Sequence, residues 1–124
     1  MNKKMFEDFH TNQKILECDK QTILLHMKQM QEFSDRLPNG LSEETKRNSD
    51  LFIAEVKKDM ETLAAEQKQV IAAINSLEDI DLQFLMKYRY VDGLPMSLVE
   101  KKMKLSHRTA YRRLNAAFEA LCVA

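Results

Sequence analysis

Apolar residues recur every seventh position in the first 37 residues, with polar residues between them. A repeated seven-residue spacing is typical of a helical coiled-coil seam, since seven residues are close to two helical turns. Pro38, Asn39 and Gly40 then end the pattern, because proline cannot continue a helix and Asn-Gly favours a turn. The spacing predicts one helix over residues 1–37, whose seam series is Phe9, Leu16, Ile23, Met30 and Leu37.

A second series of sevens predicts a second long helix. It follows Ser42, Glu43 and Glu44, a suitable start because acidic side chains favour the positive end of the helix dipole. The helix is expected to run to about Ser76. Two helices of similar length joined by a short loop fold back as an antiparallel hairpin. The second series is Val56, Leu63, Val70 and Leu77.

A two-helix hairpin buries only a narrow seam, whereas the apolar stripe here is broad and includes Leu24 and Phe52. We therefore expect the hairpin to associate with a second copy of the chain. The predicted oligomerisation residues are Leu16, Ile23, Met30, Val56, Leu63 and Val70.

The last part of the chain predicts three shorter helices. The first lies between Ser76 and Gly93, where Asp92-Gly93 supplies a C-terminal stop. The second follows Pro95, with Ser97 as its expected cap, and carries Leu98, Val99, Met103 and Leu105 for the core. Ser106 is a good N-cap for the third helix. Its apolar stripe comprises Ala110, Leu114, Ala117, Phe118 and Leu121.

A short helix, a turn and a longer helix with basic residues in its first turns match a helix-turn-helix DNA reader. The sequence therefore predicts an all-α fold. Residues 1–76 form a long antiparallel helical hairpin, and residues 77–124 form a three-helix head.

The segment from about Leu77 to Leu121 resembles the promoter-reading C-terminal region of bacterial sigma factors. It is also similar to the ArpU/RinA-like late-gene regulators of phages and prophages. Glu100 and Lys104 depart from the pattern, since the family has a small Ala and a turn Gly there. The residues that carry the resemblance are Arg89-Tyr90-Val91-Asp92-Gly93-Leu94, Leu98-Val99, Leu105-Ser106, Thr109, Tyr111-Arg112-Arg113-Leu114 and Ala117.

The resemblance implies which side chains face DNA: His107, Arg108, Thr109, Tyr111 and Arg112, behind the cap Ser106. We expect Arg108 and Arg112 to read base edges, because arginine is the commonest reader of guanine O6 and N7. Arg113 and Tyr111 are candidate phosphate contacts. The remaining predicted contacts to the DNA backbone are Lys101, Lys102 and Lys104.

Charge distribution supports this prediction. The 124-residue chain has a formal net charge of zero. From Asp81 onward, however, eight Lys or Arg oppose four Asp or Glu, which leaves +4 there and −4 in residues 1–80. A local basic field can steer a duplex even on a neutral protein.

Motifs for other functions are absent from the sequence. The three histidines, His10, His26 and His107, are far apart, and no metal, nucleotide or catalytic motif is recognisable. We expect no enzyme activity, cofactor or metal. Cys18 and Cys122 are expected to be reduced, partly buried thiols of a cytoplasmic protein. Neither a signal peptide nor a membrane span is predicted.

The sequence therefore predicts a sequence-specific, double-stranded-DNA-binding transcriptional regulator that acts as a homodimer. By resemblance, it would be encoded by a phage or prophage and could contact RNA polymerase. Two alternatives stay open. One is a DNA-packaging protein like a phage terminase small subunit. The other is a protein-interaction module that docks on RNA polymerase or another partner through the sigma-like head.

Overall fold

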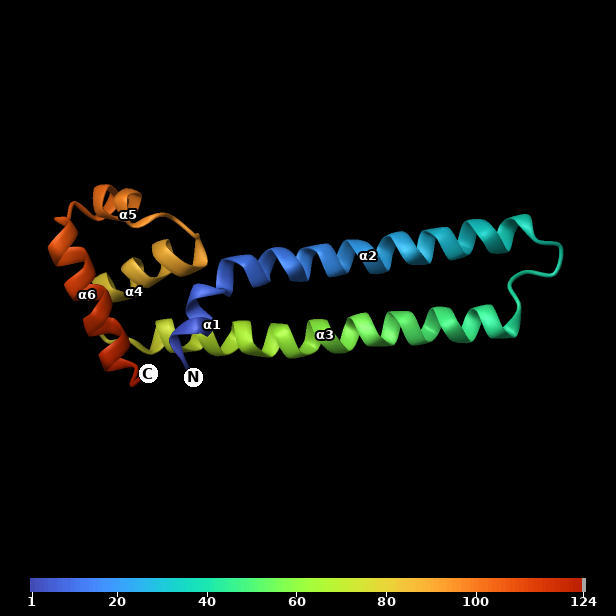
Figure 1. The fold of residues 1–124 in the computed structure, drawn as a ribbon, viewed down its shortest axis with the longest axis horizontal. Coiled ribbons are helices and arrows are strands. Elements are labelled where there is room, and N and C mark those ends of the chain that lie inside the picture. Colours follow the sequence, from blue (N-terminus) through green and yellow to red (C-terminus); the bar gives the residue numbers. More distant parts are fainter. Residues whose placement is uncertain (124) are drawn as a thin grey trace. The chain divides into compact units, whose positions relative to one another are not determined.

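The computed structural model describes residues 1–123, which contain helices and no strand. This confirms the predicted all-α class. Figure 1 shows the elements in chain order. None of the helices described is both long and apolar enough to cross a membrane. The helices are α1 (Lys3–Glu7), α2 (Phe9–Arg36), α3 (Glu43–Ser76), α4 (Ile80–Met86), the π-helix η1 (Lys87–Val91), α5 (Met96–Met103) and α6 (His107–Ala120).

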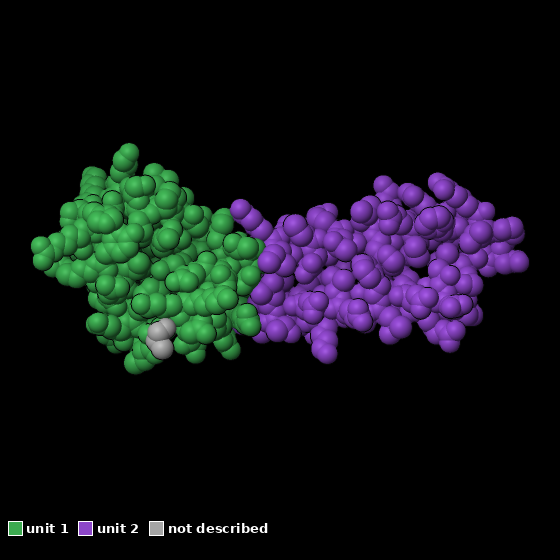
Figure 2. All heavy atoms as spheres, viewed as in Figure 1, with its two compact units in different colours: residues 1–13, 66–124 green, residues 14–65 purple. Residues whose placement is uncertain are grey.

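The chain divides into two compact units, coloured separately in Figure 2. The hairpin unit is residues 14–65, and the head unit combines residues 1–13 with the chain from residue 66 onward. This division differs from the predicted boundary after residue 76. The amino-terminal segment and the carboxyl-terminal part of α3 belong to the head unit, because their apolar side chains complete its core.

Within the hairpin unit, α2 and α3 run antiparallel on either side of a short loop (Figure 1). His26 joins the two helices: its Nε2 lies 2.7 Å from Ser49 Oγ, and its ring lies 4.6 Å from that of Phe52. Gly40 takes a left-handed φ of 71° in the loop. The Ser42 hydroxyl accepts from the Thr45 backbone N–H at 3.1 Å, so the predicted start signal of α3 is confirmed.

Burial in the hairpin unit is limited to one narrow seam. Leu16 and Ile23 are buried, and Met30, Val56 and Leu63 are half-buried. These predicted oligomerisation residues thus face the seam of a single chain, and Val70 is fully buried in the head unit. Other apolar side chains of the hairpin unit are left exposed, namely Ile15, Leu24, Leu25, Met27, Phe33, Leu37, Leu51 and Phe52.

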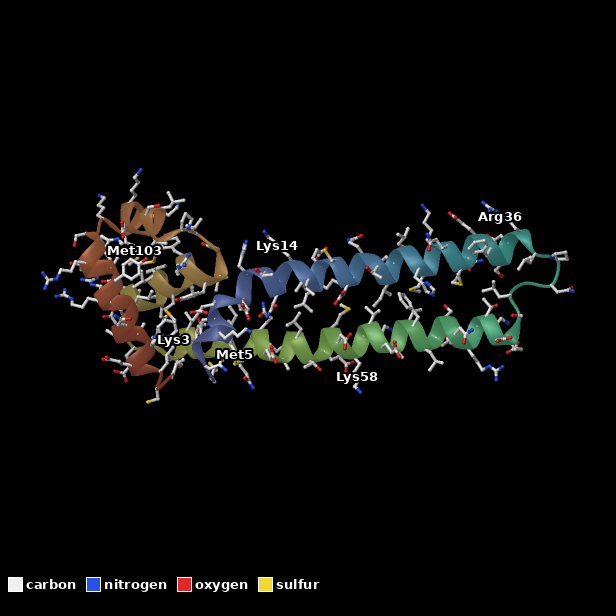
Figure 3. All side chains as sticks on the ribbon, in the orientation of Figure 1. Lys3, Met5, Lys14, Arg36, Lys58 and Met103 are labelled. Carbon is white, nitrogen blue, oxygen red and sulfur yellow. The ribbon has the colours of Figure 1, made fainter. Side chains whose placement is uncertain are left out.

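Cations on the hairpin unit lie away from its seam. Figure 3 shows Lys14, Arg36 and Lys58 pointing outward from the facing helix, and all three are exposed. The seam is therefore apolar at its centre and flanked by solvated charge, as a heptad pattern predicts.

The predicted single helix over residues 1–37 is wrong at Asp8, where α1 ends and α2 begins. Asn2 caps α1 by accepting from the Met5 N–H at 3.2 Å. The interruption separates Phe6 from the seam of the hairpin. Phe6 packs instead in the core of the head unit, where it has no exposed surface. No proline or glycine marks this break, so the sequence gives no local signal for it.

Three aromatic rings hold the amino-terminal segment in the head unit. The Phe6 ring meets those of Tyr90 and Phe118 edge-on, with centroids 6.0 and 5.4 Å away. Such pairs add about 0.5–1.5 kcal/mol beyond the area they bury. Nearby, the buried Gln67 side chain donates from Nε2 to the Phe9 carbonyl at 2.9 Å. This hydrogen bond offsets the cost of burying the amide.

The segment that leads into α5 passes close to the His10 ring at Gly93. Helix α4 is capped by Asp79 and continues directly into η1. Gly93 then takes φ +70°, and a Cβ there would lie 2.5 Å from the His10 ring. Only glycine fits both conditions. The predicted stop at Asp92-Gly93 is confirmed, and it sets the direction in which α5 begins.

Candidate nucleic-acid interface

Helices α5 and α6 are joined by a tight turn at Lys104. Lys104 takes the left-handed conformation, with φ 54° and ψ 46°. The Leu105 N–H donates to the Glu100 carbonyl at 3.0 Å, which closes the end of α5 in the way a glycine usually does. Lysine stands here where the sigma-like resemblance predicted glycine, and the turn is left-handed despite the steric cost of a side chain.

Side-chain capping differs between the two helices. Ser106 accepts from the Thr109 N–H at 3.2 Å and donates its hydroxyl hydrogen to Thr109 Oγ1 at 2.9 Å, which confirms the predicted N-cap of α6. Ser97 does not cap α5: Pro95 occupies the cap position, and Ser97 lies in the first turn. Ser106 and Thr109 thus already use hydroxyl groups within the protein, which reduces what they offer DNA.

The apolar stripe of α6 is confirmed as core. Its inward residues Ala110, Leu114, Ala117 and Phe118 are buried, and Val99 of α5 is fully buried. Leu98 departs from the expectation, because 38% of its surface remains exposed. Helix α6 is thus fixed along one face, which leaves the other face of its opening turns outside the core.

Four of the predicted DNA contacts lie together on that outer face. His107, Arg108, Tyr111 and Arg112 are exposed, and their spacing of one, three and one residues makes them neighbours on a helix. Arg108 and Arg112 form no ion pair within residues 1–123. Arg113 is placed differently: it is half-buried, with Nη1 4.0 Å from Asp81 Oδ2.

The three lysines of the predicted interface are all exposed, on or directly after α5. Lys102 Nζ lies 5.7 Å from the centre of the Tyr88 ring, a cation–π distance that places it over η1. From residue 95 onward the sequence has six Lys or Arg against two Glu, so this part of the head unit has a positive field.

One contact was missed by sequence reasoning. His107 Nδ1 lies 2.6 Å from Glu100 Oε1, across the turn between α5 and α6. The Glu100 side chain is 17% exposed and that of His107 is 75% exposed. The His107 ring also lies 4.6 Å from that of Tyr111. The sequence drew attention to Glu100 only as a misfit for close packing, although a histidine seven residues later was a signal for this pair.

Metal-binding side chains do not gather in the described part of the chain. No three His, Cys, Asp or Glu side chains among residues 1–123 are arranged to hold a metal ion. Cys18 and Cys122 are free and exposed rather than partly buried. The surface of α5 and α6 is the densest group of the residues predicted to bind.

A protein-family model described as a protein of unknown function (DUF1492) matches residues 43–122. The chain belongs to the DUF1492 family. No curated protein and no solved structure matches it. The part that matches the family model begins with α3 and extends through α6 to residue 122, so it includes the whole α5–turn–α6 surface. The DUF1492 match does not include α1 and α2.

Proposed function

We propose that this DUF1492 protein is a sequence-specific DNA-binding transcriptional regulator that binds duplex DNA as a homodimer. The observation that carries the proposal is the exposed cationic surface on the opening turns of α6, where Arg108 and Arg112 have no acidic partner within residues 1–123. A capped helix with this surface, preceded by a short helix and a turn, suits the major groove.

The residues have separate roles in this proposal. Arg108 and Arg112 read base edges, each worth about 1–3 kcal/mol of discrimination if its contact is bidentate. Tyr111 and the three lysines contact phosphates, which fix the position of α6 without reading sequence. Arg113 pairs with Asp81 and adds positive charge next to the surface that contacts DNA. The sigma-like resemblance supports the same assignment, and it adds a phage or prophage origin and contact with RNA polymerase to the proposal.

The dimer is proposed from the apolar surface of the hairpin unit. Leu24, Leu25 and Leu51 are each more than half exposed. Large apolar side chains exposed on a monomer are candidates for contact with a partner. A second copy would cover it and place two heads in one molecule, which raises the effective concentration of the second head at paired half-sites.

A salt-titrated mobility shift with the Arg112→Ala variant tests the proposal. We expect the wild-type protein to bind a selected site, with affinity that falls steeply as salt rises. Arg112→Ala should lose about tenfold or more in preference for that site over random duplex. Arg36→Ala is the matched control, since Arg36 is also exposed but lies in the hairpin unit. Equal behaviour of the two variants, with circular dichroism unchanged, contradicts the proposal.

A protein-interaction module is the second candidate, and one observation favours it. On α4, Ile80 is 62% exposed and Phe84 is 49% exposed, with the Phe84 ring stacked on Tyr88. Such a surface suits a partner protein, for which RNA polymerase is the first to test. Two results together would favour this candidate. The wild-type protein would capture polymerase but show no salt-dependent DNA binding, and Phe84→Ala would lose the capture. A ring-shaped oligomer in native mass spectrometry would instead favour the terminase-like alternative.

A further inference from the structure

We infer that Glu100 fixes the tautomer of His107, so that His107 reads an exocyclic amine of adenine or cytosine through its Nε2 lone pair. This rests on the proposed function. Glu100 is a positioning residue here, because it acts on the base pair only through His107. The inference concerns one base pair beside those read by Arg108 and Arg112.

The geometry supplies the first step. The distance of 2.6 Å between His107 Nδ1 and Glu100 Oε1 is that of a strong, charge-assisted hydrogen bond. An ionised carboxylate can only accept, so the hydrogen of this bond belongs to Nδ1. Which nitrogen of a histidine carries the proton is set by the hydrogen bond that the other makes. When the ring is neutral, its free lone pair is therefore on Nε2.

Partial burial of Glu100 shields one side of this pairing from solvent. The Glu100 side chain is only 17% exposed, so solvent competes weakly for its carboxylate. On the other side, the His107 ring lies against Tyr111, with 4.6 Å between the ring centres. The ring is thus held by a hydrogen bond at one nitrogen and by an aromatic neighbour, while 75% of the side chain stays exposed.

Groove chemistry gives the consequence. His107 is the first residue of α6, and the amino-terminal residues of a recognition helix reach base edges. In the major groove, adenine N6 and cytosine N4 present hydrogen-bond donors, whereas guanine O6 and N7 are acceptors. An Nε2 lone pair bonds the amines and faces an unfavourable acceptor in guanine. His107 therefore discriminates in the direction opposite to that of the neighbouring arginines.

The tautomer is observable without DNA. Long-range ¹H–¹⁵N NMR distinguishes protonated from unprotonated ring nitrogens, and His107→Phe identifies the signals of His107 among the three histidines. We expect wild-type His107 to show a hydrogen on Nδ1 and none on Nε2. Glu100→Gln should shift this distribution toward Nε2–H, since its amide can donate to Nδ1. Wild-type signals with the hydrogen on Nε2 would overturn the inference.

The base preference is tested by selecting binding sites from random duplex DNA. Wild-type protein should prefer adenine or cytosine at one position, and both Glu100→Gln and His107→Phe should lose about tenfold of that preference, the value of one net hydrogen bond. Glu119→Gln is the matched control: it removes the same charge from an exposed position late in α6. It should change overall affinity through charge and leave the preference intact.

The outcomes separate the two proposals. Sequence-specific binding by the wild type with an unchanged preference in Glu100→Gln and His107→Phe overturns this inference alone. A guanine preference that depends on His107 also overturns it, because it requires a donor at Nε2. Absence of any salt-dependent DNA binding by the wild type overturns the proposed function, and the base-reading role of His107 with it.

Discussion

The two units of this DUF1492 chain use similar helices to different effect. In the head unit the helices cover one another on several sides. Four of its side chains have no exposed surface, namely Phe6, Ile74, Leu85 and Met86. The hairpin unit has longer helices, yet it buries little beyond Leu16 and Ile23. A helix pair covers one stripe of each member, whereas a cluster of short helices covers several.

The contrast indicates what each unit is suited to do. A closed core can hold a recognition surface rigidly, and the head unit has such a core behind α6. An open pair of helices with apolar residues on its outer faces gains stability from a partner, which is the basis of the proposed dimer. The following predictions test whether the units differ in this way, in order of decreasing effect.

The largest effect is expected in the head unit, from Phe6→Ala. Phe6 is fully buried between Tyr90 and Phe118, and removing its ring should lower the free energy of unfolding by about 3–5 kcal/mol. Chemical denaturation followed by circular dichroism measures it. Phe33→Ala is the control in the hairpin unit, where Phe33 is 51% exposed. In dilute protein it should cost less than about 1 kcal/mol. Equal costs would remove the contrast between the units.

Association through the hairpin unit should respond to Leu24→Lys. Leu24 is 59% exposed, and burial of a leucine side chain contributes about 1.5–3 kcal/mol, so the dimer dissociation constant should rise at least about tenfold. Sedimentation equilibrium measures this constant. Gln29→Lys adds the same charge at an exposed polar position of α2 and should change it little. A strictly monomeric wild type at micromolar concentration contradicts the dimer.

A gain in stability is expected from Lys104→Gly in the head unit. Lys104 has φ 54°, a conformation that glycine adopts without a Cβ penalty, so unfolding should cost about 0.5–1 kcal/mol more. Thermal unfolding measures the change. Lys104→Gln loses the same charge and keeps the Cβ, so it should give no such gain. If both variants stabilise the protein equally, relief of charge repulsion is the cause instead of the turn.

The smallest effect concerns alkaline pH. Burial raises the pKa of Tyr90 above its ordinary value of 10.0, although the neighbouring Arg89 partly opposes this. The folded protein therefore keeps a proton that the unfolded chain releases. Stability from this group is fully present below pH 10 and is lost as pH rises through the folded pKa. Denaturation at pH 9 and pH 11 should show a smaller alkaline loss for Tyr90→Phe than for wild type.

Local signals in the sequence predicted local structure well. The heptad series predicted α3 and most of α2, and Ser42, Gly93 and Ser106 act at the helix ends where their chemistry suggested. The apolar stripe of α6 was also recognisable, because a period of 3.6 residues needs no information from the rest of the chain. Each of these features depends on residues within a few positions of one another.

Features that depend on distant residues were not predicted. The break at Asp8 has no local signal, since its benefit is the packing of Phe6 against Phe118, far along the chain. The boundary between the units differs from the predicted one after residue 76 for the same reason. The Glu100–His107 contact crosses the turn at Lys104. The left-handed conformation of this lysine could not be predicted from the sequence. Periodicity describes which face of a helix is apolar, and it does not identify what covers that face.

The packing of Phe6 against Phe118 has a consequence for synthesis of the protein. A ribosome makes Phe6 long before Phe118, and the head unit cannot close its core until both are available. Helices α2 and α3 emerge in the interval and can pair while the head is still unfinished. A nascent chain would then form its apolar hairpin surface before the exposed surface of α6 that we propose to contact DNA, so neighbouring chains on one messenger would meet through their hairpins first.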